Sequence, residues 1–453
     1  MWGAALHEQA TGVHRPLTAT SLLLEALDGG SRLLVLGIDH CLLEAAETNA
    51  IKSRVRAASG IPPEQIHIAL SHTHGSAWLS RSRSHLPGGH LIGPYLDSVG
   101  ETCAKLAKQA AEQLQPATIV YGTSRCSLAA HRDFWDETSQ QIVCGFNPDG
   151  FADDTVMLAK VVIPKPDAQA RVLGTVVNYA CHPTTLAWEN TLVSPDFVGA
   201  MREVVERETN APCLFLQGAS GELGPREGFV GDTAIADRNG RQLGFAALSG
   251  LEAMPPPGTF FEYAGPVVSG ATLGTWKHQP LSEHEKQRQE LFASKRCTVP
   301  LAYRVDLPTR ENTQAELVKW QTLEEAAAQL NDAIAVRNAH AQVERMNRQL
   351  TRLESLPAGR AYPFPVGIWR LGDSLWIFTA GEQYQAFQTS LRERFPHLAV
   401  MVATISDDWQ PGYLPAAASF GYGIYQETIA AVAPGALEAL IEAVTRECRK
   451  LLR

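Results

Sequence analysis

Residues 65–75 read QIHIALSHTHG, a run of apolar and β-branched residues that stops abruptly at polar ones. Continuous apolar runs of this length are typical of strands that are buried on both faces of a sheet. The same pattern recurs along the chain, and each run ends at a polar or glycine-containing turn: residues 32–40, 172–181, 213–217 and 374–380. These five stretches predict buried strands.

Stretches with helical spacing lie between or after these runs. They span residues of about 42–58, 95–114, 197–208, 314–356 and 434–452. Strands that alternate with helices predict an α/β fold, with a layered mixed β-sheet core, flanking helices and a long helical insertion at about 314–356. The proline-rich segment 254–258 is either a linker within the domain or a boundary before the helical insertion.

The composition indicates which classes of partner to expect. The chain has 453 residues, of which 45% are hydrophobic and 19% charged, and its net charge is −9. This charge argues against nucleic acid or an anionic membrane surface as the main partner, because both need a basic face. We expect a small-molecule substrate and no transmembrane segment, since no apolar stretch approaches the roughly 20 residues that span a bilayer. The oligomeric state stays open.

The cysteines and the first residues bear on the cellular compartment. Eight cysteines are scattered through the chain and none forms a CxxC pair, which is typical of reduced thiols. Residues 1–8 show neither a basic start nor a long apolar run, so we expect no secretion signal. These features predict a cytoplasmic enzyme.

Several chemically useful side chains follow the predicted strands. In α/β sheets ligand sites form beyond the carboxyl ends of strands, where loops and helix N-termini converge. His72 and His74 are two residues apart, so at a strand end both imidazoles can face one cavity and bind zinc. The alternative is a pair of ordinary surface or core histidines.

Three further positions have the same ambiguity. His182 follows the run 172–181 and precedes a proline that stops a strand ladder, but a lone histidine is often structural. Glu382 follows Gly381 after another run, and it either caps a helix or binds a cation. The stretch 413–425 carries three tyrosines, which can also serve only for packing.

The ordered set of segments resembles the neutral ceramidase family, zinc amidases that cleave the N-acyl bond of ceramide. GVHRPL (12–17) is similar to the family's opening motif, and GIPPE (60–64) followed by SHTHG (71–75) is similar to its first zinc segment. YACHP (179–183) resembles its second histidine motif, and Gly381-Glu382 its Pro-Gly-Glu. The tyrosine spacing 413, 422, 425 is also that of the family.

This resemblance implies a set of site residues and a single catalytic domain. The implied zinc ligands are His72, His182, Glu382 and Tyr413. The implied catalytic residues are His74, beside the substrate carbonyl or the metal-bound water, Arg132 in the substrate site, and the active-site tyrosines Tyr422 and Tyr425. One neutral-ceramidase-like catalytic domain is expected over residues 1–453, without the family's C-terminal immunoglobulin-like domain.

One departure from the family pattern concerns the nucleophile. The family has Gly-Asp/Asn-x-Ser-Pro, whereas residues 221–225 read GELGP, so Gly224 stands at the serine position. We therefore expect a zinc-dependent hydrolase that cleaves an amide bond with metal-activated water. The alternatives are a zinc hydrolase of an ester, lactone or glycosidic bond, and a non-catalytic zinc-binding homologue. Asp39 is expected to support a histidine ligand or to cap a helix, and Glu222 to offer a hydrogen-bond acceptor to substrate.

Overall fold

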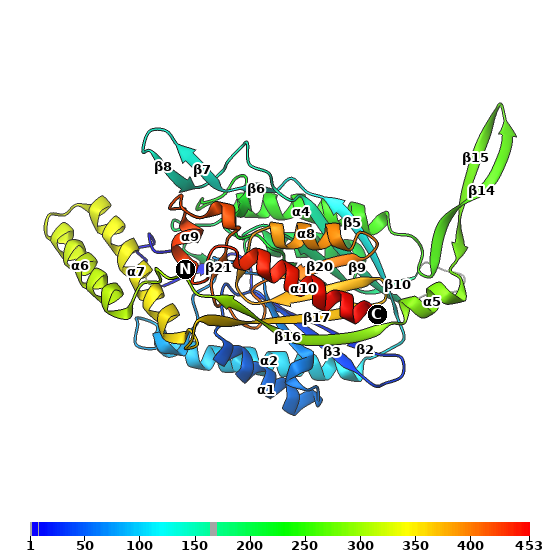
Figure 1. Cartoon of the computed structure of the whole chain (residues 1–453), viewed down its shortest axis with the longest axis horizontal. Coiled ribbons are helices and arrows are strands. Elements are labelled where there is room, and N and C mark those ends of the chain that lie inside the picture. Colours follow the sequence, from blue (N-terminus) through cyan, green and yellow to red (C-terminus); the bar gives the residue numbers. More distant parts are fainter. Residues whose placement is uncertain (1, 8, 164–169) are drawn as a thin grey trace.

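Three sheets, each with its own pair of helices, make up most of the molecule. The computed structural model describes residues 2–7, 9–163 and 170–453. The sheets contain β2 (Ala19–Glu25), β3 (Arg32–Ile38) and β4 (Ile66–Leu70); then β12 (Cys213–Gln217), β10 (Arg171–Tyr179), β9 (Thr155–Ile163) and β5 (Thr118–Arg125); and β16 (Phe292–Ala302), β17 (Ala361–Leu371), β18 (Ser374–Thr379) and β20 (Ala399–Ala403) (Figure 1). The five expected strands are present as β3, β4, β10, β12 and β18.

Each sheet is mixed. The pairs β3–β4, β10–β12 and β18–β20 are parallel, and the remaining pairs of the three sheets are antiparallel. A parallel pair needs a crossover, and helices supply it. This explains why strands and helices alternate in the sequence, and the fold is α/β.

A central hydrophobic cluster joins the three sheets. It combines side chains such as Val35 from the first sheet, Leu214 and Val176 from the second, and Trp369 and Phe378 from the third. All five side chains are buried. The sheets therefore pack against one another through their inner faces, and their outer faces are left for helices.

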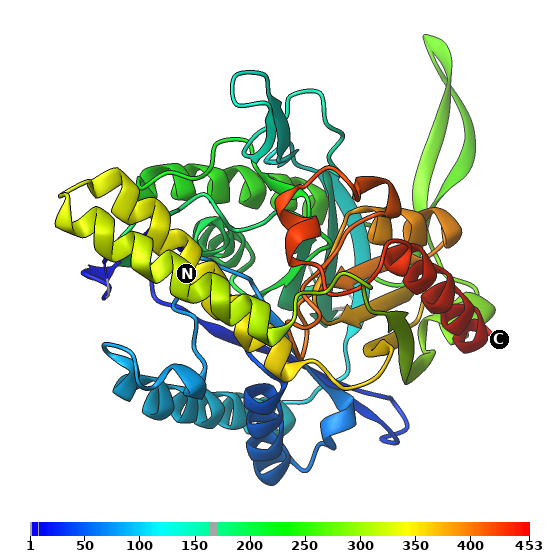
Figure 2. The ribbon, with the colours of Figure 1, turned by 60° about the vertical axis from the view of Figure 1, so that its left-hand side comes forward.

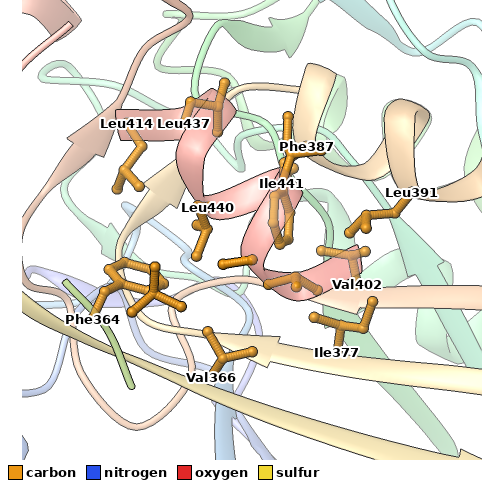
Figure 3. Close-up of a cluster of buried hydrophobic side chains, with 14 of the residues drawn as sticks. Phe364, Val366, Ile377, Phe387, Leu391, Val402, Leu414, Leu437, Leu440 and Ile441 are labelled. Atoms are coloured by element: carbon orange, nitrogen blue, oxygen red, sulfur yellow. The ribbon is translucent and has the colours of Figure 1, made fainter. Parts of the chain in front are cut away.

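Helices cover those outer faces. α1 (Ala45–Ser59) and α2 (Ile92–Glu112) share a hydrophobic cluster with the first sheet, and α3 (Phe197–Thr209) and α4 (Thr233–Glu252) with the second. The third sheet packs against α8 (Ala386–Arg394) and α10 (Ala436–Leu452). Figure 3 shows Leu440 and Ile441 of α10 near the side chains of Val366, Ile377 and Val402 in that sheet.

Two long extensions leave this body. α6 (Arg310–Gln329) and α7 (Ala333–Ser355) form a helical pair that contains most of the expected helical stretch 314–356 (Figures 1 and 2). β14 (Thr259–Ser269) and β15 (Ala271–Pro280) form a hairpin that projects from the body (Figure 1). The proline-rich segment 254–258 directly precedes this hairpin, not the helical pair.

Short elements complete the chain. They are β1 (Gly12–Val13), β6 (Ala129–His131), β7 (Asp133–Asp136), β8 (Gln141–Cys144), β11 (Leu192–Val193), β13 (Leu223–Pro225), α5 (Glu283–Gln289), β19 (Glu382–Gln383), β21 (Tyr413–Leu414) and α9 (Tyr425–Ile429), with 3-10 turns at 63–65, 81–83, 89–91 and 417–419. Within the described part of the chain, no helix has both the length and the apolar character to cross a bilayer.

Candidate metal centre

The ends of three strands, one from each sheet, deliver side chains to a common point. His72 follows β4, His182 follows β10, and Glu382 follows β18. The loop before Glu382 needs a glycine, because Gly381 has φ +67° and a Cβ there would lie 2.7 Å from the carbonyl oxygen of Gly412. His72 itself has φ 65°, an uncommon conformation for a residue with a side chain that is often found at functional sites.

The donor atoms of the four expected ligands lie close together. The Nε2 atoms of His72 and His182 are 3.0 Å apart, and Glu382 Oε2 lies 3.4 Å from the first and 3.1 Å from the second. The hydroxyl oxygen of Tyr413 is 3.4 Å from His182 Nε2. Four ligands at about 2.0–2.2 Å from a tetrahedral centre stand about 3.3–3.6 Å from one another. The observed spacing is close to that arrangement.

The other ring nitrogens fix the tautomers of both histidines. His72 Nδ1 donates to the carbonyl oxygen of Cys41 at 2.8 Å, and His182 Nδ1 donates to that of Ser220 at 2.9 Å. A carbonyl can only accept, so each Nδ1 carries the hydrogen and each Nε2 keeps a lone pair in the neutral ring. Once the His72 ring is neutral, two Nε2 lone pairs therefore face one point. The buried Glu382 Oε2, which has no hydrogen-bond partner among the described residues, faces the same point. A cation fits this donor set.

The electrostatics of the protein alone agree with a cation at this point. Burial lowers the pKa of His182 to about 4. Burial also opposes the charge of His72, but the sulfur of Cys41 and the carboxylate of Glu382 outweigh it and raise the pKa of His72 to about 10. The two histidines in turn hold the pKa of Glu382 well below its usual range in spite of its burial. In the protein alone, His72 is therefore an imidazolium that balances the Glu382 carboxylate, and a metal ion would displace its Nε2 proton.

Short strand pairings place the remaining expected residues. Tyr413 pairs with Glu382 in the β19–β21 ladder, and the Glu382 amide donates to Gly412 at 2.9 Å. Arg132 follows β6, and its Nη2 donates to the carbonyl oxygen of Gly221 at 2.5 Å. Its guanidinium carbon lies 5.5 Å from the centre of the Tyr413 ring. The structure therefore brings Arg132 beside the proposed ligands.

His74 lies at the same cluster but has a different environment. Its ring centre is 5.0 Å from that of His72 and 5.7 Å from that of His182. Neither of its nitrogens has a hydrogen-bond partner among the described residues, and burial lowers its pKa well below 6.5. Trp2 stands 4.9 Å from it, ring centre to ring centre. His74 is therefore a neutral imidazole, and both of its ring nitrogens are available for hydrogen bonds to a ligand.

The two later tyrosines differ in position. The Tyr425 ring lies 5.8 Å from that of Tyr413 and is 43% exposed, so it borders the cluster. Tyr422 is 66% exposed, and its backbone amide donates to the carboxylate of Glu427. The structure therefore brings Tyr425 to the centre, but it gives the Tyr422 side chain no described contact there.

The surroundings of Gly224 show what replaces the family's serine. A Cβ at this position would meet Thr184 Oγ1 at 3.6 Å and Arg132 Cδ at 4.0 Å, so it would point toward Arg132. Ser220 does not replace the serine, because it lies on the Nδ1 side of His182 and accepts from Gln217 at 2.6 Å.

Both expectations for Asp39 are wrong, whereas Glu222 accepts hydrogen bonds from the protein's own backbone and its expected role toward a substrate stays a prediction. Asp39 forms a bidentate ion pair with Arg202, with both distances 2.9 Å, and neither caps a helix nor touches a histidine ligand. Both carboxylate oxygens of Glu222 accept from the Gln385 amide at 3.0 Å, and burial raises the pKa of this carboxyl to about 8. Glu222 therefore supports the loop after Glu382.

The sequence patterns did not indicate a buried cluster that lies next to Gly412, the residue before Tyr413. Trp78, Arg352 and Trp409 come from three separate segments, and all are buried. None lies in a stretch whose spacing suggests chemistry, and only the tertiary structure brings them together.

Comparisons with known proteins bear on the fold of the chain and on its relatives. No protein-family model matches the chain. In sequence, the chain is 23% identical over 241 residues to the neutral ceramidase of Pseudomonas aeruginosa, a match that spans 49% of this chain and only 34% of that protein.

Solved structures match over a longer stretch. A crystal structure of neutral ceramidase from Pseudomonas aeruginosa superposes with a TM-score of 0.62 at 15% identity, covering 98% of this chain and 70% of the other. A ceramidase complexed with C2 gives 0.64 at 15% identity, with 98% and 71% covered. The chain has the fold of these enzymes. It is similar to neutral ceramidase in fold and, over about half of its length, distantly similar in sequence, which confirms the resemblance.

Proposed function

We propose that this protein is a zinc-dependent hydrolase that cleaves an amide (N-acyl) bond with an activated water molecule. The observation that carries the proposal is the convergence of His72 Nε2, His182 Nε2 and Glu382 Oε2 on one point. Backbone carbonyl groups hold both imidazoles in this orientation through Nδ1. The likeness to neutral ceramidase supports an amide as the bond that is cleaved.

The proposed ligands are His72, His182, Glu382 and Tyr413. Nitrogen and oxygen donors of these types suit zinc in a catalytic site. When bound, zinc would lower the pKa of a water molecule toward neutrality and polarise the scissile carbonyl. The carbonyl groups of Cys41 and Ser220 would hold both imidazoles in the binding tautomer, a role that outer hydrogen-bond partners play in most such sites.

His74 and Arg132 are the proposed catalytic side chains. Both ring nitrogens of His74 lack a hydrogen-bond partner among the described residues, so His74 would orient the attacking water or accept its proton, and would return that proton to the leaving amine. Arg132 would stabilise the developing oxyanion from the Tyr413 side. Tyr425, and Tyr422 once its side chain turns inward, would bind polar groups of the substrate.

A panel of chromogenic amides, esters and glycosides tests this proposal. Amides should be hydrolysed, a chelator should abolish the activity, and added zinc should restore it. Replacing His74 by asparagine should lower kcat by about 10²–10⁴-fold, the usual contribution of general acid–base catalysis, without loss of bound zinc. His90→Asn, at an exposed histidine, is the matched control. Amide hydrolysis that resists chelation, or turnover of glycosides alone, would refute the proposal.

A further inference from the structure

Buried N–H donors without acceptors gather on the α7 side of the metal centre. Arg352 is 5% exposed, Trp409 4% and Trp78 7%. The Arg352 guanidinium carbon lies 5.4 Å from the Trp409 ring centre, and the two indole rings are 6.0 Å apart. Among the described residues, Arg352 Nε and both indole Nε1 atoms have no hydrogen-bond partner. Guanidinium and indole nitrogens donate only, so the three together lack an acceptor.

This donor cluster of Arg352, Trp409 and Trp78 borders the proposed metal ligands. A Cβ on Gly412 would lie 3.5 Å from Arg352 Nε, and Gly412 directly precedes Tyr413. Burial lowers the pKa of Arg352 to about 10, while the charges of Tyr425, Glu382 and Tyr413 oppose this shift. The guanidinium therefore lies within electrostatic reach of the centre.

No carboxylate among the described residues neutralises Arg352. Its side-chain hydrogen bond is to the neutral amide of Gln349, and it forms no described ion pair. The nearby Asp408 carboxylate is engaged with the backbone amides of Trp409 and Gln410. Glu344, on the same helix as Arg352, pairs with Arg83 instead.

A second buried arginine, Arg132, lies beside the metal centre and is positively charged like Arg352. Arg132 is 3% exposed, has no described ion pair, and its Nε lacks a hydrogen-bond partner among the described residues. Asp133 acts on Arg132 electrostatically, but neither Arg132 nor Arg352 forms an ion pair with a carboxylate among the described residues. Two buried guanidinium groups without an ion pair are costly to desolvate and favour a partner of opposite charge. Such a site favours an anionic ligand.

We propose that the substrate is an amide that carries a carboxylate, and that the donor cluster of Arg352, Trp409 and Trp78 binds this carboxylate beside the metal centre. The proposal rests on the proposed hydrolase function and extends it to a substrate class. N-acyl amino acids are the simplest amides of this kind. A carboxylate accepts from several donors at once, and hydrogen bonds between charged groups are about twice as strong as neutral ones.

Equilibrium binding to the full chain, as purified, tests the proposal without turnover. The probes are N-octylsulfonylglycine and N-octylsulfonylglycinamide, two sulfonamides that resist hydrolysis and differ only in the terminal carboxylate. Calorimetry should show that N-octylsulfonylglycine binds about 10- to 100-fold more tightly than N-octylsulfonylglycinamide, as expected for a hydrogen bond to a charged group. Equal affinities for the native protein would overturn the proposal.

Variants assign the preference to Arg352. R352Q should reduce the affinity ratio to near one, and R352K, the milder variant if R352Q does not fold, should reduce it in part. R337Q, at an exposed arginine of the same helix, is the matched control and should leave the ratio unchanged. A ratio that persists in R352Q or is unchanged in R352K would overturn the assignment, because a purely structural arginine would not discriminate between the two probes. If the protein hydrolyses no amide, only the hydrolase proposal fails, because the binding measurements do not depend on turnover.

Discussion

At the scale of single residues, two backbone carbonyl groups orient the histidines of the candidate metal centre. By accepting the Nδ1 hydrogens of His72 and His182, Cys41 and Ser220 turn both Nε2 lone pairs toward Glu382. Every residue carries a carbonyl, so no sequence pattern indicates which one accepts. The histidines and the glutamate, in contrast, could be predicted, because their side chains follow apolar runs and match a family order.

Gly224 is the residue at which this protein departs from the family's nucleophile. A serine side chain fits there, since its Cβ would make only ordinary van der Waals contacts with Thr184 and Arg132. We predict that Gly224→Ser changes the free energy of unfolding by less than about 1 kcal/mol and raises amide hydrolysis by no more than a few-fold. Thermal unfolding and steady-state kinetics measure both.

The control for this prediction concerns the neighbouring hydroxyl. Thr184→Val should keep the activity within about tenfold of the native value, because in the proposed mechanism activated water, and not a side-chain hydroxyl, supplies the nucleophile. The water mechanism is wrong if the native protein is inactive and only Gly224→Ser hydrolyses amides. It is also wrong if Thr184→Val is inactive although folded.

At the scale of elements, the buried strands could be predicted from the sequence and the exposed strands could not. β3, β4, β12 and β18 are almost entirely buried, so their apolar runs are continuous and easy to recognise. β16 and the hairpin strands β14 and β15 are largely exposed and carry mixed residues. β16 pairs with the distant β17, whereas β14 and β15 pair only with each other, and without a continuous apolar run none of the three could be recognised as a strand.

One contact between elements should make stability depend on pH. His67 of β4 bonds through Nδ1 to Asp407 at 2.8 Å, stacks on Phe378, and leaves Nε2 without a partner among the described residues. Burial lowers the pKa of His67 to about 4, and the pKa of Asp407 is held low by His67 and Lys52 in spite of its burial.

The sign follows from these two depressed values. His67 is protonated near pH 6.5 in the unfolded chain but only near pH 4 in the folded one, so its stabilising contribution is complete above pH 6.5. It should decline by about 3 kcal/mol as the pH falls from 6.5 to 4, and Asp407 adds a further loss below that range. Denaturant unfolding at several pH values measures this decline. His67→Gln should flatten it relative to the exposed control His85→Gln, and equal slopes for the two variants would contradict the assignment.

At the scale of the whole molecule, the centre exists only because three sheets share one core. His72, His182 and Glu382 each end a strand of a different sheet, and the central cluster of Val35, Val176 and Trp369 among others holds the sheets together. Sequence spacing alone could not show that these ligands meet. The α/β class could be predicted from alternating elements, whereas the meeting of the sheets depends on tertiary packing.

Metal content tests the central claim most directly. Elemental analysis of the purified native protein should find about one zinc per chain, as a single four-ligand site requires. His72→Ala and His182→Ala should each lose it, while the exposed control His90→Ala retains it. Folded His72→Ala and His182→Ala variants with as much zinc as the native protein, or a native protein that binds none when zinc is supplied, would contradict the account.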